Sequence, residues 1–216
     1  MGFEGANGST GAPGMTDESP SHHGTATVTG TASISTAAFK FGTSSLLLNG
    51  GVIQFPDSND WWFAGNPFTI EMWINYIDAN PGDWGFLVGQ WQSTGQFGWE
   101  FWAQNPYISW NTSTTGSDNN ADLSATLTPT AGIWYHVAFD YDGTRIRLYL
   151  NGVQSGQTVL SRTLFNSTNH LTIGGDEIGT TLNFKGYIDE IRITKGVARY
   201  ATSTSFPVPT AAFPRS

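Results

Sequence analysis

Apolar and polar residues alternate with a period of two along much of the chain. The clearest run is Phe68–Tyr76, in which even-numbered positions are apolar and odd-numbered positions carry Thr, Glu, Trp and Asn. Successive side chains of a strand point to opposite faces, so this run predicts a long strand with one dry face and one mixed face. Similar runs recur at short spacing with turn residues between them. The pattern predicts an all-β protein.

A hairpin is predicted around the turn signal Asp142-Gly143. Alternate residues of the segment 133–139 are apolar before this turn, and the even-numbered residues of Arg145–Leu150 are apolar after it. Both strands should therefore place one face in a core. The odd-numbered positions of the second strand, Tyr149 among them, are expected to point outward.

A second hairpin is predicted around Asn49-Gly50-Gly51. The flanking runs Ser45–Leu48 and Val52–Phe55 are both rich in Leu, Val and Ile. Asn-Gly and Gly-Gly tolerate the positive φ angles of tight turns, which favours two paired strands on either side of them.

The closing run of apolar residues changes parity. Ile188 lies on the same side as the apolar residues before it, whereas Ile191 lies on the opposite parity. A β-bulge at Asp189-Glu190 would restore a single inward face. One of these two carboxylates would then lie near the core, where it needs hydrogen-bond donors or a cation.

Composition narrows the class of protein. The chain has 216 residues, of which 38% are hydrophobic and 12% charged, enough for one large sandwich. We expect a single domain over residues 1–205 and a Pro-rich, extended tail over residues 206–216. A net charge of −8 disfavours nucleic acid as a partner. The chain has no apolar stretch long enough to insert into a membrane. The residues that follow Met1 do not have the pattern of a signal peptide, so we expect none. The absence of Cys excludes disulfides.

Three motifs together resemble the laminin-G-like, concanavalin A-like lectin/glucanase superfamily. They are Gly132–Asp140 with Asp142-Gly143 and Arg147–Gly152, the closing strand Gly186–Ile193, and the strand Phe68–Ile74. The resemblance implies an antiparallel β-sandwich of the jelly-roll, concanavalin A-like type. It says little about function, because this fold carries many functions.

Further segments resemble laminin-G-like modules of bacteriophage structural proteins. They are Phe3–Thr10, the segment 34–38, Lys40–Gly42, Lys195–Tyr200 and the Pro-rich tail. This resemblance implies a virion protein, in a tail fibre or as capsid decoration, whose partners are other virion proteins or copies of itself. Modules of this type begin with more apolar residues than this chain has before Phe3. We expect the edge of the short first strand to be completed by a neighbouring subunit or covered by the tail.

Catalysis is not expected. Glycosidases of this shape place two carboxylates on one face of a strand. Here the acidic pairs are Asp17-Glu18, Asp176-Glu177 and Asp189-Glu190. Neighbours on a strand point to opposite faces, so none forms such a pair. The adjacent His22 and His23 are expected to be solvated.

A structural calcium ion is the one cofactor considered. Ca²⁺ prefers six to eight oxygen ligands, and the loop that contains Asp17 and Ser19 is rich in oxygen. The resemblance would pair this loop with Asp189, with Glu4 nearby. The alternative is that Asp189 accepts hydrogen bonds from backbone N–H groups and needs no ion.

Glycan binding needs flat aromatic rings beside hydrogen-bonding side chains. Trp73 shares the mixed face of its strand with Glu71 and Asn75, and Trp102 lies on the same parity as Glu100. These five residues are candidates for a surface that binds cell-surface glycans. The alternative is that they pack beneath a covering loop.

Three functions remain open on the sequence. The first is a non-enzymatic, virion-associated module for adhesion or particle decoration that binds glycans. The second is a carbohydrate-binding module of a secreted or cell-surface bacterial protein. The third, from a different class, is a polysaccharide-cleaving sandwich enzyme.

Overall fold

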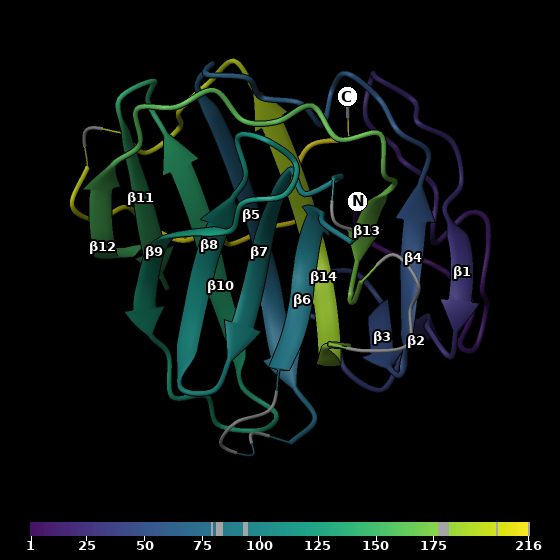
Figure 1. Cartoon of the computed structure of the whole chain (residues 1–216). Helices are drawn as coiled ribbons and strands as arrows, with labels where there is room; N and C mark the ends of the chain where they lie inside the picture. Colours follow the sequence, from purple (N-terminus) through teal and green to yellow (C-terminus); the bar gives the residue numbers. More distant parts are fainter. Residues whose placement is uncertain (79, 81–83, 93–94, 177–181, 202, 216) are drawn as a thin grey trace.

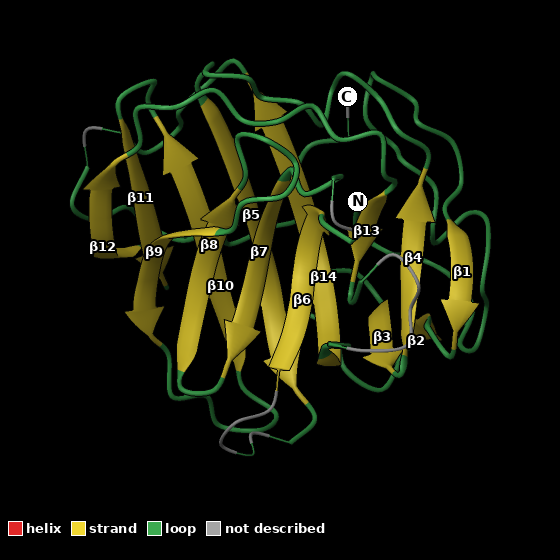
Figure 2. Cartoon of the chain, viewed as in Figure 1, coloured by secondary structure: helices red, strands yellow, loops and turns green. Residues whose placement is uncertain are grey.

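Two antiparallel sheets of seven strands each lie face to face in the computed structural model of this chain (Figures 1 and 2). The structure describes residues 1–78, 80, 84–92, 95–176, 182–201 and 203–215. Within these ranges there is no helix, and hence none that could cross a membrane. The prediction of an all-β, antiparallel sandwich is confirmed.

The sheet nearer the viewer in Figure 1 is here called the front sheet, and the other the back sheet. The front sheet has the order β1 (Thr27–Gly30), β4 (Gly51–Phe55), β13 (Leu171–Ile173), β6 (Trp84–Gln90), β7 (Trp99–Gln104), β8 (Tyr107–Thr112) and β9 (Asn120–Thr126). The back sheet has the order β12 (Val153–Val159), β11 (Arg145–Leu150), β10 (Trp134–Tyr141), β5 (Phe68–Tyr76), β14 (Lys185–Lys195), β3 (Ser45–Asn49) and β2 (Ser33–Ser35).

The core lies between the sheets and is rich in aromatic rings. Trp99 and Trp110 stack at 5.3 Å between ring centroids, and both are almost fully buried. Phe139 of the back sheet contacts Trp110 and lies edge-on to Phe101. The even-numbered residues of β5 face this core, as the alternation predicted.

The hairpin predicted around Asp142-Gly143 is present as β10 and β11. Phe139 pairs with Leu148, and Tyr141 pairs with Ile146. The carboxylate of Asp142 accepts hydrogen bonds from the N–H groups of Thr144 and Arg145, which stabilises the turn.

The hairpin predicted around Asn49-Gly50-Gly51 is wrong. β3 pairs with β2 and β14 in the back sheet, whereas β4 pairs with β1 and β13 in the front sheet. The turn therefore crosses from one sheet to the other. Gly50 does adopt a positive φ of 96°. Because a turn between sheets needs the same backbone freedom as a hairpin, the turn residues could not distinguish the two.

The β-bulge predicted at Asp189-Glu190 is confirmed. In the pairing of β14 with β5, Asp189 lies opposite Trp73, and the next pair is Arg192 opposite Glu71. Between these two pairs β14 advances three residues and β5 only two, so β14 has one extra residue. Glu190 supplies the extra step with a φ of 52°. The bulge brings Ile188 and Ile191 onto the core face together.

The segments 196–201 and 203–215 cover the outer face of the back sheet (Figure 1). Tyr149 is fully buried there, although alternation alone placed it outward. Its hydroxyl donates to the carbonyl oxygens of Tyr200 and Ser203, at 2.7 and 2.9 Å. Phe206 stacks on Tyr200 with 3.6 Å between ring centroids. The boundary at residue 205 stays a prediction, but residues on both sides of it pack against the sandwich.

Candidate functional site

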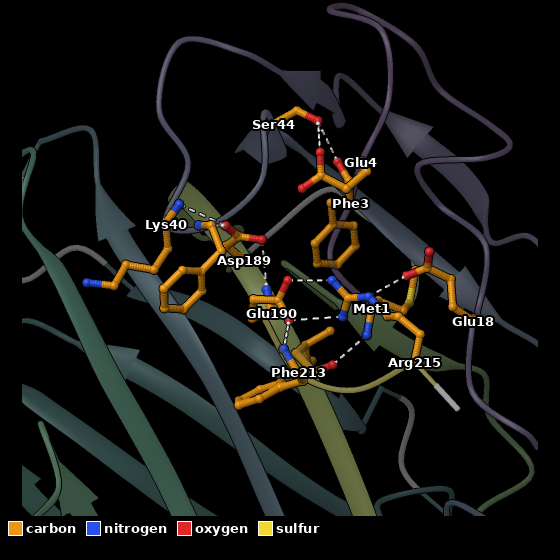
Figure 3. A network of polar contacts seen from close by, with 12 residues as sticks. Met1, Phe3, Glu4, Glu18, Lys40, Ser44, Asp189, Glu190, Phe213 and Arg215 are labelled. Carbon is orange, nitrogen blue, oxygen red and sulfur yellow. Dashed lines mark hydrogen bonds and ion pairs between the residues drawn. The ribbon is translucent and has the colours of Figure 1, made fainter. Parts of the chain in front are cut away.

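The bulge of β14 directs two neighbouring carboxylates to different partners (Figure 3). Asp189 and Glu190 are both fully buried. Asp189 accepts hydrogen bonds from the N–H groups of Lys40 at 2.8 Å, Phe41 at 3.1 Å and Glu190 at 2.9 Å. Burial raises the pKa of Asp189 to about 7, while the N–H groups of Phe41 and Lys40 act in the opposite direction. Backbone N–H donors therefore satisfy Asp189, as the alternative to a bound cation proposed.

Glu190 attaches the end of the chain to the sandwich. It accepts a hydrogen bond from the N–H of Phe213 at 2.7 Å, and from Nη1 and Nη2 of Arg215 at 2.9 and 2.5 Å. Arg215 also forms an ion pair with Glu18 at 3.1 Å. A hypothetical Cβ on Gly2 would collide with the Arg215 side chain, so Gly2 and Arg215 lie against each other.

The four residues proposed for calcium do not share one set of hydrogen-bond partners. Asp17 and Ser19 do meet, because Ser19 donates to Asp17 through its N–H and its hydroxyl. Glu4 accepts instead from the N–H and hydroxyl of Thr43, and Asp189 has the separate donors given above. Across the described ranges, no three His, Cys, Asp or Glu side chains form a group that could hold a metal. The donor sets fit hydrogen bonding better than a shared cation, and calcium stays a prediction.

A cleft of about 720 Å³ lies where β4 and β13 of the front sheet face β14 of the back sheet. Its lining residues come from parts of the chain that are far apart in sequence. They are Met1, residues 17–21, His23, Phe55, Asp60, Trp61, Leu171, Ile173, residues 191–195, Arg199 and residues 213–215. The volume is in the range of sites for small molecules.

The floor of this cleft is apolar. Phe55 and Ile173 contribute from the front sheet, and Ile191 contributes from the back sheet. All three belong to the core cluster. Since the bulge sets the parity of β14 beyond Glu190, it also decides that Ile191 faces the cleft.

One wall of the cleft is a chain of carboxylate, imidazole and carboxylate. Asp17 Oδ2 lies 2.8 Å from Nδ1 of His23, and Asp60 Oδ2 lies 3.1 Å from its Nε2. The His23 ring lies on Trp61 at 4.2 Å between centroids. Burial opposes ionisation of Asp17, but the N–H groups of His23 and Ser19 hold its pKa below the ordinary value. His23 is thus mostly buried and bonded, and the prediction that it is solvated is wrong.

The first glycan candidates lie beneath covering residues: the hydroxyl of Tyr200 donates to Glu71, and Lys40 and Phe41 pack against Trp73. Trp73, Glu71 and Asn75 are all buried on the outer face of β5. Glu71 accepts from Nε and Nη2 of Arg192 at 3.0 and 2.7 Å and from the hydroxyl of Tyr200 at 2.8 Å. These three residues are therefore packed beneath covering residues, as the alternative interpretation stated.

Glu71 also meets His136, which is fully buried on β10. Nε2 of His136 lies 3.2 Å from Glu71 Oε2. Burial opposes ionisation of Glu71, yet the hydrogen bond from His136 and the charge on Arg192 hold its pKa below the ordinary value. This network joins three strands of the back sheet beneath the segment that covers them.

The second glycan candidates lie on the outer face of the front sheet. Glu100 and Trp102 are two residues apart on β7 and so share a face. Nδ2 of Asn111 donates to Glu100 at 2.6 Å, and burial raises the pKa of Glu100 to about 7. Trp102 is half-buried. Their role in binding stays a prediction, and they do not line the cleft.

Sequence reasoning missed the cleft. Its polar residues come from loops and strand ends far apart in the chain, and Trp61, Lys195 and Arg199 follow no pattern of their own. A signal for one part was present: Asp17 and His23 flank a short loop that contains Pro20. That spacing permits a hydrogen bond across the loop but does not predict one.

The fold is an antiparallel β-sandwich that carries a cleft of about 720 Å³. A family model described as Concanavalin A-like lectin/glucanases superfamily matches residues 48–200. The chain belongs to this laminin-G-type family. A comparison with curated proteins finds no match.

Solved structures agree on the fold. The binding domain of Paraclostridial Mosquitocidal Protein 1 is similar over 83% of this chain and 46% of its own, with a TM-score of 0.61 and 15% identity. The receptor binding domain of botulinum neurotoxin mosaic serotype C/D is similar over 81% and 44%, with a TM-score of 0.58 and 15% identity. This chain thus spans less than half the length of either toxin domain.

Domain 4 of AbnA, a GH43 extracellular arabinanase from Geobacillus stearothermophilus, matches over more of its length. Its structure in complex with arabinotriose is similar over 84% of this chain and 87% of its own, with a TM-score of 0.52 and 21% identity. At these identities the three likenesses show the fold alone. These similar structures are binding domains and one domain of a glycan-active enzyme.

Proposed function

We propose that this protein is a non-catalytic binding module that holds a short saccharide in the cleft between β4, β13 and β14. The observation that carries the proposal is the cleft itself: about 720 Å³, with an apolar floor and polar walls. Sugar rings have apolar C–H faces and a polar edge, so they fit a site of this composition. The toxin binding domains and the arabinotriose complex support a binding role for this type of fold.

A non-catalytic role is supported by the state of the carboxylates around the cleft. Asp17 is bonded to Ser19 and His23, and Glu190 to Phe213 and Arg215. A glycosidase needs one carboxyl group free to give up a proton and a second free to attack or to activate water. Release of reducing sugar from a polysaccharide that the protein binds would contradict this part of the proposal.

The setting we propose is a phage particle, where the module serves in adhesion or decoration beside other virion proteins or copies of itself. The support is the resemblance of Phe3–Thr10 and Lys195–Tyr200 to phage modules. The alternative setting is a secreted bacterial protein. Mass spectrometry of purified particles decides between them, because absence of the protein from virions would overturn the first setting.

A glycan array followed by titration calorimetry tests the binding role. Ser21 is exposed and lines the cleft, so Ser21→Trp fills the site without touching the core. We expect this variant to lose at least about tenfold in affinity, a free-energy difference of about 1.4 kcal/mol. The matched control is Ser161→Trp, at an exposed position outside the cleft, which should bind normally. Failure of the unaltered protein to bind any glycan would overturn the proposal.

A further inference from the structure

Positive charge is concentrated at the cleft of an otherwise acidic chain. The chain has nine Lys and Arg residues against seventeen Asp and Glu. Four of the nine line the cleft: Arg192, Lys195, Arg199 and Arg215. Among the described residues, the acidic residues that do so are Asp17, Glu18 and Asp60. The lining thus carries more basic than acidic side chains, whereas the whole chain is acidic.

Every carboxylate on the lining already has a partner. Asp17 and Asp60 both contact His23, and Glu18 is paired with Arg215. A cationic ligand would have to displace these contacts. The acidic residues of the lining therefore have few lone pairs left to accept hydrogen bonds from a ligand.

Two of the four cations are likewise engaged. Arg192 donates twice to buried Glu71, and Arg215 donates twice to buried Glu190. Both carboxylates are inaccessible to solvent, so these guanidinium groups neutralise buried negative charges.

Lys195 and Arg199 are the cations that face the cleft with donors to spare. Lys195 has the parity of Ile191 and Ile193, so it projects toward the front sheet at the end of β14. Its ammonium donates to the carbonyl oxygen of Asn59 at 2.5 Å, and within the described residues it has no carboxylate partner. An ammonium group can donate three hydrogen bonds, so two remain.

Arg199 is exposed and also lines the cleft, next to residues of the outer face of the back sheet. Its Nε donates to the hydroxyl of Thr194 at 3.1 Å and lies 4.0 Å from Glu71 Oε1. Within the described residues its two terminal nitrogens make no hydrogen bond, and such a fork matches the geometry of a carboxylate.

We infer that the ligand of the cleft is an acidic oligosaccharide whose uronic acid carboxylates bind separately, one at Lys195 and one at Arg199, with the sugar rings above the apolar floor. This inference rests on the proposed function and adds the substrate class to it. A sulfate ester carries the same charge as a carboxylate but has a different shape. The experiment below distinguishes sulfated from uronate ligands.

The test uses calorimetry with trisaccharides of galacturonate, glucuronate and mannuronate, each beside its methyl ester. Esterification removes the charge and leaves the sugar, so the acid should bind at least about tenfold more tightly than its ester for one of the three pairs. A rise in salt from about 50 to about 500 mM should weaken binding of the acid and leave a neutral ligand unchanged. Lys195→Gln and Arg199→Gln should each remove most of the preference for the acid.

The matched control is Arg145→Gln, which removes the same charge from an exposed position on β11 outside the cleft. It should keep full affinity. Equal binding of acids and esters would overturn the inference and leave the proposed function intact, as would binding of a sulfated galactose trisaccharide in place of every uronate. Binding of no saccharide on the array or in calorimetry would overturn both.

Discussion

Arg215 lies next to the last residue of the chain, yet it should contribute strongly to stability. Its guanidinium provides two of the three hydrogen bonds that Glu190 accepts, and Glu190 has no exposed surface. Removal of one partner from a buried ion pair leaves a buried charge and costs about 3–5 kcal/mol. The side chain of Arg215 is 28% exposed, so water reaches part of the pair and reduces this value. For Arg215→Gln we expect a loss of about 2–3 kcal/mol.

A double-mutant cycle separates the pair from other effects. Glu190→Gln alone should cost a similar amount, because it leaves Arg215 without its main acceptor. The double variant should cost less than the sum of the two, by about 1–2 kcal/mol, since it removes both charges together. Urea unfolding followed by Trp fluorescence gives each free energy of unfolding, and Arg145→Gln serves as a surface control within about 0.5 kcal/mol of the unaltered protein.

Two results would refute this reasoning. A loss below about 0.5 kcal/mol for Arg215→Gln would mean that the last residues do not hold Glu190 in solution. Strict additivity in the cycle would mean that the two side chains do not interact. Either result would mean that Arg215 does not attach the end of the chain to β14.

Three further predictions follow from the buried polar groups. Burial raises the pKa of Glu100 and of Asp189 to about 7; the folded state then holds these protons more tightly than the unfolded chain, so unfolding free energy should fall as pH rises from about 4.5 to 7. Urea titrations across this range should show a flatter profile for Glu100→Gln, and an unchanged profile would count against the raised pKa. Tyr200→Phe should cost about 1–2 kcal/mol, because Glu71 loses a buried donor; thermal unfolding measures it, and an unchanged melting temperature would contradict the role of that hydroxyl. Removal of calcium with a chelator should leave the melting temperature unchanged, since backbone donors satisfy Asp189; a clear decrease would show a bound ion.

The parts of the fold that sequence could predict are those that depend on local alternation. The run Phe68–Tyr76 forms β5 with the predicted bounds, and the change of parity between Ile188 and Ile191 located the bulge. Both predictions follow from the period of two in a strand, which is a property of the backbone alone.

Alternation does not show what covers an outer face. It placed Tyr149 and Glu71 away from the core correctly, but both are buried because the segments 196–201 and 203–215 lie over them. The same limit applies to Asn49-Gly50-Gly51, where local turn preference cannot decide which sheet receives the next strand. These features depend on long-range contacts that residue pattern does not encode.

The cleft was beyond prediction for a related reason, and the bulge explains why it lies where it does. One extra residue at Glu190 turns Asp189 toward the N–H groups of Lys40 and Phe41, and turns Glu190 toward the end of the chain.

The same step shifts every later residue of β14 by one position, which directs Ile191 and then Lys195 toward the front sheet. Without it, Arg192 and not Lys195 would have the inward parity. A single left-handed residue thus anchors two covering segments and sets the charge at the mouth of the cleft. We therefore regard the bulge as part of the proposed binding site, although neither of its carboxylates is available to a ligand.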